Sequence, residues 1–92
     1  MESAEALAEQ LVESRLAACV QVLPQMTSIY LWEGEMQKER EALLLIKTLP
    51  EKWDEVCSFI AANHTYEVPE IVALECSRVG ASYQAWLGEV VD

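Results

Sequence analysis

The stretch Cys19-Val20-Gln21-Val22-Leu23 begins an extended region that resumes, after an interruption at Pro24, in Ser28-Ile29-Tyr30-Leu31-Trp32. Branched and aromatic residues favour strands, whereas proline cannot donate a hydrogen bond to a neighbouring strand. The sequence therefore predicts one bent strand or two short ones. Near Trp32 both alternating sets of side chains are apolar. A single layer of helices would cover only one face, and contact between subunits is the simplest cover for the other.

Further strand signals follow this region. Glu33-Gly34-Glu35 has the composition of a turn, and the polar residues 37–40 lead into the run Ala42-Leu43-Leu44-Leu45-Ile46. This run is too short and too evenly apolar for an amphipathic helix, so it predicts a strand buried on both faces. Pro69 then ends any helix, and Ile71-Val72-Ala73-Leu74 predicts one more strand.

Three stretches have the apolar spacing of helices. Ser3 is expected to cap a helix that ends near Arg15 or Leu16, and its apolar stripe is Ala4, Leu7, Ala8, Leu11 and Val12. Pro50 suits the first turn of a helix over residues 51–63. Gly80 precedes a last helical stripe of Tyr83, Trp86, Leu87, Val90 and Val91. The order α-β-β-α-β-α predicts a single α+β domain over residues 1–92, with helices on one face of a sheet.

The composition limits the classes of function. Sixteen acidic residues against six basic ones give a net charge of −10, which repels phosphate backbones and anionic membrane surfaces. No apolar run approaches the roughly 18 to 20 residues that span a bilayer. The chain begins with acidic residues and lacks a basic, apolar leader. We therefore expect a cytoplasmic protein that binds neither nucleic acid nor membrane, and the small size favours self-association.

Cys19, Cys57 and Cys76 are odd in number and lack the spacing of a zinc or redox motif. They lie inside apolar stretches, which predicts reduced thiols in a reducing compartment. Cys57 and Cys76 are expected in the core. For Cys19 the alternatives are core packing and binding of a soft cation through its thiolate.

The sequence resembles the CutA divalent-cation-tolerance family in five blocks that follow one another in order. The first two blocks run from Leu11 to Val20 and from Thr27 to Gly34, and the third is Leu45-Ile46-Lys47-Thr48. The fourth is His64-Thr65-Tyr66-Glu67-Val68-Pro69-Glu70-Ile71, and the fifth is residues 83–87. In the fourth block the family has proline where this chain has Thr65. Together the blocks cover nearly the whole chain.

The resemblance implies a ferredoxin-like α+β sandwich that assembles into a homotrimer through its sheets, with the architecture of PII-type signalling proteins. It also implies a link to copper tolerance and metal binding, with no defined reaction. Family members begin with an apolar strand before the first helix, whereas this chain starts at the helix. In the family's order that strand is central, so we expect a truncated or rearranged sheet with unpaired backbone groups.

Cys19, His64 and Glu67 are the candidate metal ligands. The resemblance ranks Cys19 above the other cysteines, and imidazole with carboxylate suits zinc or copper(II). His64 also continues the apolar stripe of the second predicted helix, where it could instead interact with the last carbonyl groups. His64 and Glu67 alone supply too few donors for a tight metal site, so we expect binding of copper or another divalent cation to be weak. Cys19 or residues of a second subunit would be needed to complete the coordination.

Tyr30, Trp32, Lys47 and Tyr66 form an alternative candidate set. The resemblance groups them in a cleft between subunits that would bind a small anionic ligand or a protein partner, as in a PII-like signalling or scaffold protein. Otherwise the aromatic side chains are packing anchors and the Lys47 ammonium lies in solvent at a strand end. No nucleophile or phosphate-loop motif is present, so we expect no enzyme. A cysteine-dependent enzyme using Cys19 and His64 is a third, weaker hypothesis.

Overall fold

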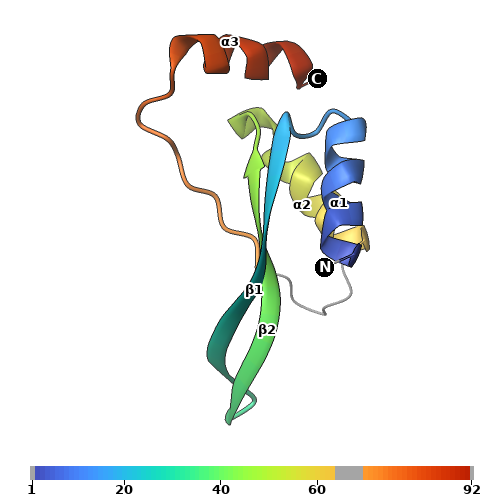
Figure 1. The fold of residues 1–92 in the computed structure, drawn as a ribbon, viewed down its shortest axis with the longest axis vertical. Coiled ribbons are helices and arrows are strands. Elements are labelled where there is room, and N and C mark those ends of the chain that lie inside the picture. The colour runs from blue at the N-terminus through green and yellow to red at the C-terminus, as the bar shows by residue number, and fades with distance from the viewer. Residues whose placement is uncertain (1, 64–69, 92) are drawn as a thin grey trace.

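The computed structural model describes residues 2–63 and 70–91 of the 92-residue chain. The elements are α1 (Glu2–Glu13), β1 (Cys19–Trp32), β2 (Glu35–Lys47), a 3-10 helix (Pro50–Lys52), α2 (Trp53–Asn63) and α3 (Ala81–Val90). β1 and β2 form one long antiparallel hairpin. As Figure 1 shows, α1 and α2 lie beside the half of the hairpin that is farther from the turn, α3 lies across its open end, and the turn half projects away from all three helices. The α+β class is therefore confirmed.

The apolar stripe of α1 behaves as its spacing predicts. Leu7, Ala8 and Leu11 are buried, and Leu11 has no exposed surface. The helix ends in a Schellman motif: Arg15 has φ 62°, its amide donates to the carbonyl of Val12, and the Leu16 amide donates to that of Leu11. The predicted cap at Ser3 is wrong, because α1 begins at Glu2 and includes Ser3.

The hairpin turns at Glu33 and Gly34, whose φ angles are 53° and 82°. Two consecutive positive φ angles are the signature of a type I′ turn, which matches the right-handed twist of the strands. β1 is a single strand with an irregularity between Leu23 and Met26. There Pro24 and Gln25 oppose only Ala42, so the bulge accommodates a residue that has no N–H. Of the two predicted alternatives, the single bent strand is correct.

β2 is longer and more exposed than the sequence predicts. It includes residues 37–40, which were expected to lead into the strand rather than belong to it. Leu44 and Ile46 pack against the helices, but Leu43 and Leu45 are 39% and 41% exposed on the other face. Burial of this strand on both faces is therefore wrong for the single chain. The reason is that the helices in contact with the hairpin pack on the face that bears Leu44 and Ile46.

The predicted strand Ile71-Val72-Ala73-Leu74 is also wrong, because residues 70–80 contain no strand. A strand needs a neighbour with which its backbone can form hydrogen bonds. Within residues 2–63 and 70–91, β2 pairs with β1 alone, so its outer edge does not reach this segment. The observed order of regular elements is therefore α-β-β-α-α.

Two apolar clusters hold the helices to the hairpin. The larger cluster joins α1 and α2 to one face of the strands through Leu7, Leu11, Ala17, Val56 and Ile60. The smaller cluster packs α3 against the open end of the hairpin through Ala18, Leu87 and Val91. Thr48 ties the open end further by donating a 2.6 Å hydrogen bond from its hydroxyl to the carbonyl of Leu16.

Candidate metal and ligand site

Cys19 is the first residue of β1 and lies opposite Lys47, the last residue of β2. The preceding amide, that of Ala18, donates a 2.9 Å hydrogen bond to the Lys47 carbonyl. Ala17 and Ala18 are buried in different clusters, and their small side chains let the chain pass between α1 and α3. This packing fixes Cys19 at the open end of the hairpin, where its side chain is half-buried and its thiol is free.

Tyr83 of α3 interacts with Cys19, a contact that the sequence analysis missed. The pKa of Tyr83 is raised from 10.0, first by desolvation and then by the charge of the Cys19 thiolate and a hydrogen bond with that side chain. The ring of Tyr83 lies 5.5 Å from that of Trp86, centroid to centroid, at 44°. No local pattern reports this contact, because it depends on how α3 folds back over the hairpin.

Lys47 donates a 2.7 Å hydrogen bond from Nζ to Oε1 of Gln21. Gln21 pairs with Leu45, so it lies diagonally across the hairpin from Lys47 and on the same face. Among the described residues, Lys52 forms an ion pair with Glu55, and Lys47 forms none. Side chains alternate between the two faces of a strand, so Cys19 and Gln21 lie on one face of β1. With the strand register known, this alternation would have predicted Gln21 as a neighbour of Lys47.

Tyr30 and Trp32 lie at the other end of the molecule. Trp32 pairs with Glu35 beside the turn, and Tyr30 pairs with Gln37. Both aromatic side chains are exposed, at 40% and 46%. Strands advance about 3.4 Å per residue, so Trp32 lies about 40 Å from Lys47 within one chain. The structure therefore does not bring these candidate cleft residues together in a single subunit.

His64, Tyr66 and Glu67 lie outside the described residues, so Cys19 is the one candidate metal ligand that can be placed. Among residues 2–63 and 70–91, no three histidine, cysteine or acidic side chains come close enough to hold a metal ion. Cys57 is half-buried on α2, and Cys76 is exposed in the segment before α3. The prediction that Cys76 belongs to the core is wrong, because residues 70–80 are not covered by a neighbouring strand.

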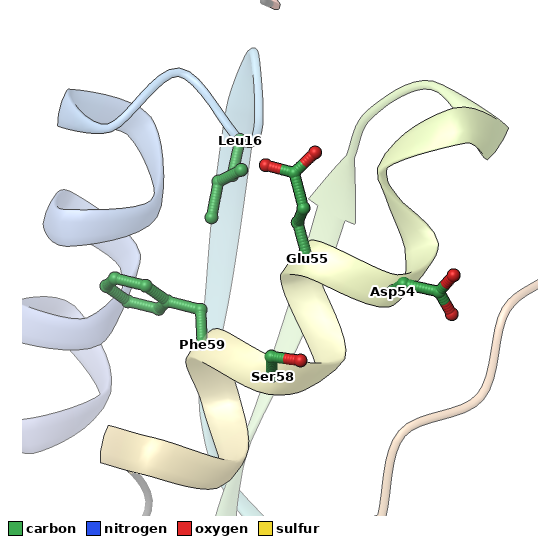
Figure 2. A pocket seen from close by; sticks show the side chains of 5 residues that line it. All are labelled: Leu16, Asp54, Glu55, Ser58 and Phe59. Carbon is green, nitrogen blue, oxygen red and sulfur yellow. The ribbon is translucent and has the colours of Figure 1, made fainter.

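A pocket of about 440 Å³ opens between Leu16 and α2. Its other lining residues are Asp54, Glu55, Ser58 and Phe59. Figure 2 shows the Glu55 carboxylate reaching toward Leu16, while that of Asp54 points away from it. Glu55 also accepts a 3.4 Å contact from Lys52 Nζ. The two carboxylates therefore do not converge on a common cation, and this pocket is a weaker candidate than the open end of the hairpin.

The projecting half of the hairpin has two faces of opposite charge. Cross-strand partners share a face, so the register separates two sets of side chains. One set, which we name the basic apolar face, consists of Ile29, Leu31, Met36, Lys38 and Arg40. The other, the acidic aromatic face, consists of Tyr30, Trp32, Glu35, Glu39 and Glu41. The three apolar side chains of the basic apolar face are 63–68% exposed, so both faces are open to contact in the single chain.

A protein-family model described as CutA1 divalent ion tolerance protein matches residues 1–90. The divalent-cation tolerance protein CutA of Thermus thermophilus is 46% identical over 88 residues, which are 96% of this chain and 85% of that protein. A CutA homologue of Xenopus laevis is 41% identical over 88 residues, and the chloroplastic CutA 1 of rice is 40% identical over 86. The chain spans 58% of the Xenopus protein and 49% of the rice protein.

Solved structures agree with these matches. The chain is similar to the Thermus thermophilus Cut A1 structure with a TM-score of 0.95 and 44% identity, covering 99% of this chain and 88% of that one. The structure of rice CutA1 matches with a TM-score of 0.97 and 37% identity, and the match covers 100% of this chain and 84% of that one. The structure of a CutA from Archaeoglobus fulgidus, described as periplasmic, matches with a TM-score of 0.96 and 36% identity. That match covers 100% of this chain and 89% of that one. Within the described part of this chain, no helix is long and apolar enough to cross a membrane.

Proposed function

Because the chain belongs to the CutA1 divalent ion tolerance family, we propose that it binds divalent cations weakly, copper among them, and contributes to metal tolerance without catalysing a reaction. The observation that carries the proposal is the family match over residues 1–90, supported by a relative named for divalent-cation tolerance. The family name denotes no enzymatic reaction.

The proposed ligands are Cys19, His64 and Glu67. A thiolate is the soft ligand that copper(I) prefers, and imidazole with carboxylate suits copper(II) or zinc. Cys19 supports the proposal by its position, half-buried at the open end of the hairpin beside a tyrosine hydroxyl. Because no three ligands converge among the described residues, the site draws on His64 and Glu67 or on a neighbouring subunit.

The active form that we propose is a homotrimer with the architecture of PII-type proteins. In this arrangement the projecting hairpin of one subunit packs against the next, with its basic apolar face on the neighbour's acidic aromatic face. Two different surfaces in contact form a heterologous interface, which closes into a ring when the rotation allows.

The compartment that we propose is the cytoplasm. The support is that the three cysteines are free, which suits a reducing environment. Relatives described as chloroplastic and periplasmic occupy other compartments, so localisation of the tagged protein in its own cell is the direct test.

Calorimetric titration of the reduced, metal-free protein with copper and with zinc tests the metal function. We expect saturable binding that Cys19→Ser and His64→Ala each weaken strongly. Cys76→Ser is the matched control, because this thiol is exposed in the segment before α3 and belongs to no proposed site. Binding that persists unchanged in both site variants, or that Cys76→Ser weakens equally, would contradict a dedicated site.

A second candidate function is favoured by one observation, the Lys47 ammonium. It donates a hydrogen bond to the uncharged amide of Gln21 and forms no ion pair with the described residues, so its charge is available to a ligand. We propose, as the alternative, a trimeric PII-like sensor or scaffold that binds a small anion between subunits. Titration with citrate and inorganic phosphate tests it. Binding lost in Lys47→Ala, kept in Lys38→Ala and indifferent to His64→Ala would favour this function over metal binding.

A further inference from the structure

The pocket between Leu16 and α2 is a surface that neither proposed function uses. Its apolar walls are Leu16 and Phe59, which are half-buried and pack against the cluster that joins α1 and α2 to the hairpin. Figure 2 shows both side chains on the side of α2 that faces α1. The pocket therefore lies on the helices, away from the projecting half of the hairpin that the proposed trimer uses.

The backbone around this pocket is fixed by its own hydrogen bonds. The Leu16 amide donates a 3.1 Å hydrogen bond to the Leu11 carbonyl, and the Leu16 carbonyl accepts one of 2.6 Å from the Thr48 hydroxyl. The opposite wall is α2, whose backbone bonds run within the helix. The lining residues include no strand edge, so an extended peptide finds no ladder to join there. A helix, which satisfies its own backbone and binds through side chains, is the occupant that suits such walls.

The helices beside the pocket are acidic. α1 contains four glutamates, α2 contains Asp54 and Glu55, and neither helix contains lysine or arginine. Lys52 contacts Glu55 at 3.4 Å, but the Glu55 side chain is 59% exposed, and an ion pair in such a setting contributes little. A basic side chain of a partner can therefore replace Lys52. The carboxylates of Glu55 and Asp54 point in different directions, which does not suit one metal ion but suits two separate basic side chains.

We propose that this pocket docks a basic, amphipathic helix of another protein. An apolar side chain of that helix fills the space between Leu16 and Phe59, where the small side chain of Ser58 leaves room for it. Basic side chains on either side of this anchor reach Glu55 and Asp54. An apolar helix face laid into a groove is a recurring mode of peptide recognition. A second copy of this chain is a less favourable occupant, because its helices carry the same negative charge.

The first experiment titrates the reduced, metal-free full chain into a labelled synthetic peptide, Lys-Leu-Ala-Lys-Leu-Leu-Lys-Lys-Leu-Leu-Ala-Lys. Fluorescence anisotropy measures binding at about 0.15 M salt, where exposed charges more than about 8 Å apart are largely screened. We expect saturable binding of one peptide per chain. The control peptide keeps every lysine and has glutamine in place of each leucine, and we expect it to bind at least about tenfold more weakly. Equal binding of the two peptides, or no saturable binding, would overturn the proposal.

Charge reversals in the chain locate the binding. Glu55→Lys places a positive charge at the pocket, and we expect it to weaken peptide binding about tenfold. Glu5→Lys is the matched control, because it changes the net charge equally but lies about 12 Å along α1 from Glu13, at the end of the helix next to Leu16. We expect it to change the affinity by less than about twofold. Equal weakening by both variants would mean general attraction to an acidic protein, and the proposal would be wrong.

A second variant, Ser58→Arg, covers the case in which Glu55→Lys does not fold. It fills the pocket from an exposed position on α2, and we expect it to weaken peptide binding at least as strongly. Circular dichroism establishes that each variant is folded. Hydrogen exchange of the unmodified chain should show protection by the peptide at residues 54–59, and protection only elsewhere would contradict the proposed site. Because the protein is metal-free throughout, this result is independent of the proposed metal function.

Discussion

Tyr83 of α3 interacts with Cys19 at the start of β1, although 64 positions separate the two residues in the sequence. The contact ties the last helix to the open end of the hairpin, next to the buried Ala18 and Leu87. It places a phenol beside the one proposed metal ligand that the structure describes. The environment of that thiol therefore depends on α3 as well as on β1.

The first prediction concerns the titration of this tyrosine. Desolvation and the Cys19 thiolate both raise the pKa of Tyr83 above 10.0, so Cys19→Ser should lower it part of the way back and leave the effect of desolvation. Ultraviolet absorbance during an alkaline titration measures it, with Tyr83→Phe identifying the signal and Cys76→Ser as control. Because the folded-state pKa is raised, the associated stability is present below about pH 10 and is lost as pH rises through the folded-state value. Identical titration curves for the unmodified chain and Cys19→Ser would contradict the contact.

The second prediction compares two glycines that have open space around them. Gly34 has φ 82° in the hairpin turn, whereas Gly88 lies within α3, and a Cβ at either position would meet nothing within 4 Å. Only the backbone conformation therefore differs. Gly34→Ala should destabilise the fold by about 1 kcal/mol, and Gly88→Ala should stabilise it by about 0.5–1 kcal/mol. Urea unfolding measures both, and the same sign for the two changes would contradict the turn geometry.

The elements with a clear apolar period could be predicted from the sequence. The stripe of α1 identified its buried residues, Pro50 marked the approach to α2, and Gly80 marked the start of α3. The turn at Glu33 and Gly34 was equally visible, because turn residues stood between two apolar runs. Each of these features depends on residues close together in the chain.

The predictions that were wrong concern features that depend on residues distant in the sequence. The run Ile71-Val72-Ala73-Leu74 has the composition of a strand, but strand formation also requires a paired neighbour, which composition does not report. Burial of Leu43 and Leu45 likewise depends on what covers the second face of the hairpin. For the site, the sequence singled out Cys19 and Lys47 but missed Tyr83 and Gln21, because the fold of α3 and the strand register bring them together.

The third prediction concerns the main core cluster. Leu11 has no exposed surface, so Leu11→Ala removes buried methyl groups and leaves a cavity, which should cost about 2–5 kcal/mol. The neighbouring Val12 is 40% exposed, and Val12→Ala should cost less than about 1 kcal/mol. Urea unfolding of both variants at equal protein concentration measures the difference. Similar losses would mean that the stripe of α1 is not the centre of the core.

The fourth prediction tests the proposed assembly through its apolar contacts. Leu31 is 67% exposed on the basic apolar face, so Leu31→Gln should leave the single chain folded but weaken a trimer that buries this face. Light scattering should then show a shift from three chains toward the 10.4 kDa monomer. Val12→Gln is the control, since it changes an exposed apolar residue on α1, a helix that lies away from the projecting half of the hairpin. A monomer in the unmodified protein would contradict the assembly itself.

The fifth prediction tests which faces meet in that assembly. Lys38 and Glu39 are adjacent in β2 but point to opposite faces of the hairpin, so they do not contact each other within one chain. Lys38→Glu should weaken the trimer at low salt, because two acidic faces would then meet between subunits. Adding Glu39→Lys exchanges the two charges and should restore assembly toward that of the unmodified chain. The effect should shrink at high salt, where the interaction is screened. If the second substitution weakens the trimer further, the basic apolar face of one subunit does not pack on the acidic aromatic face of the next.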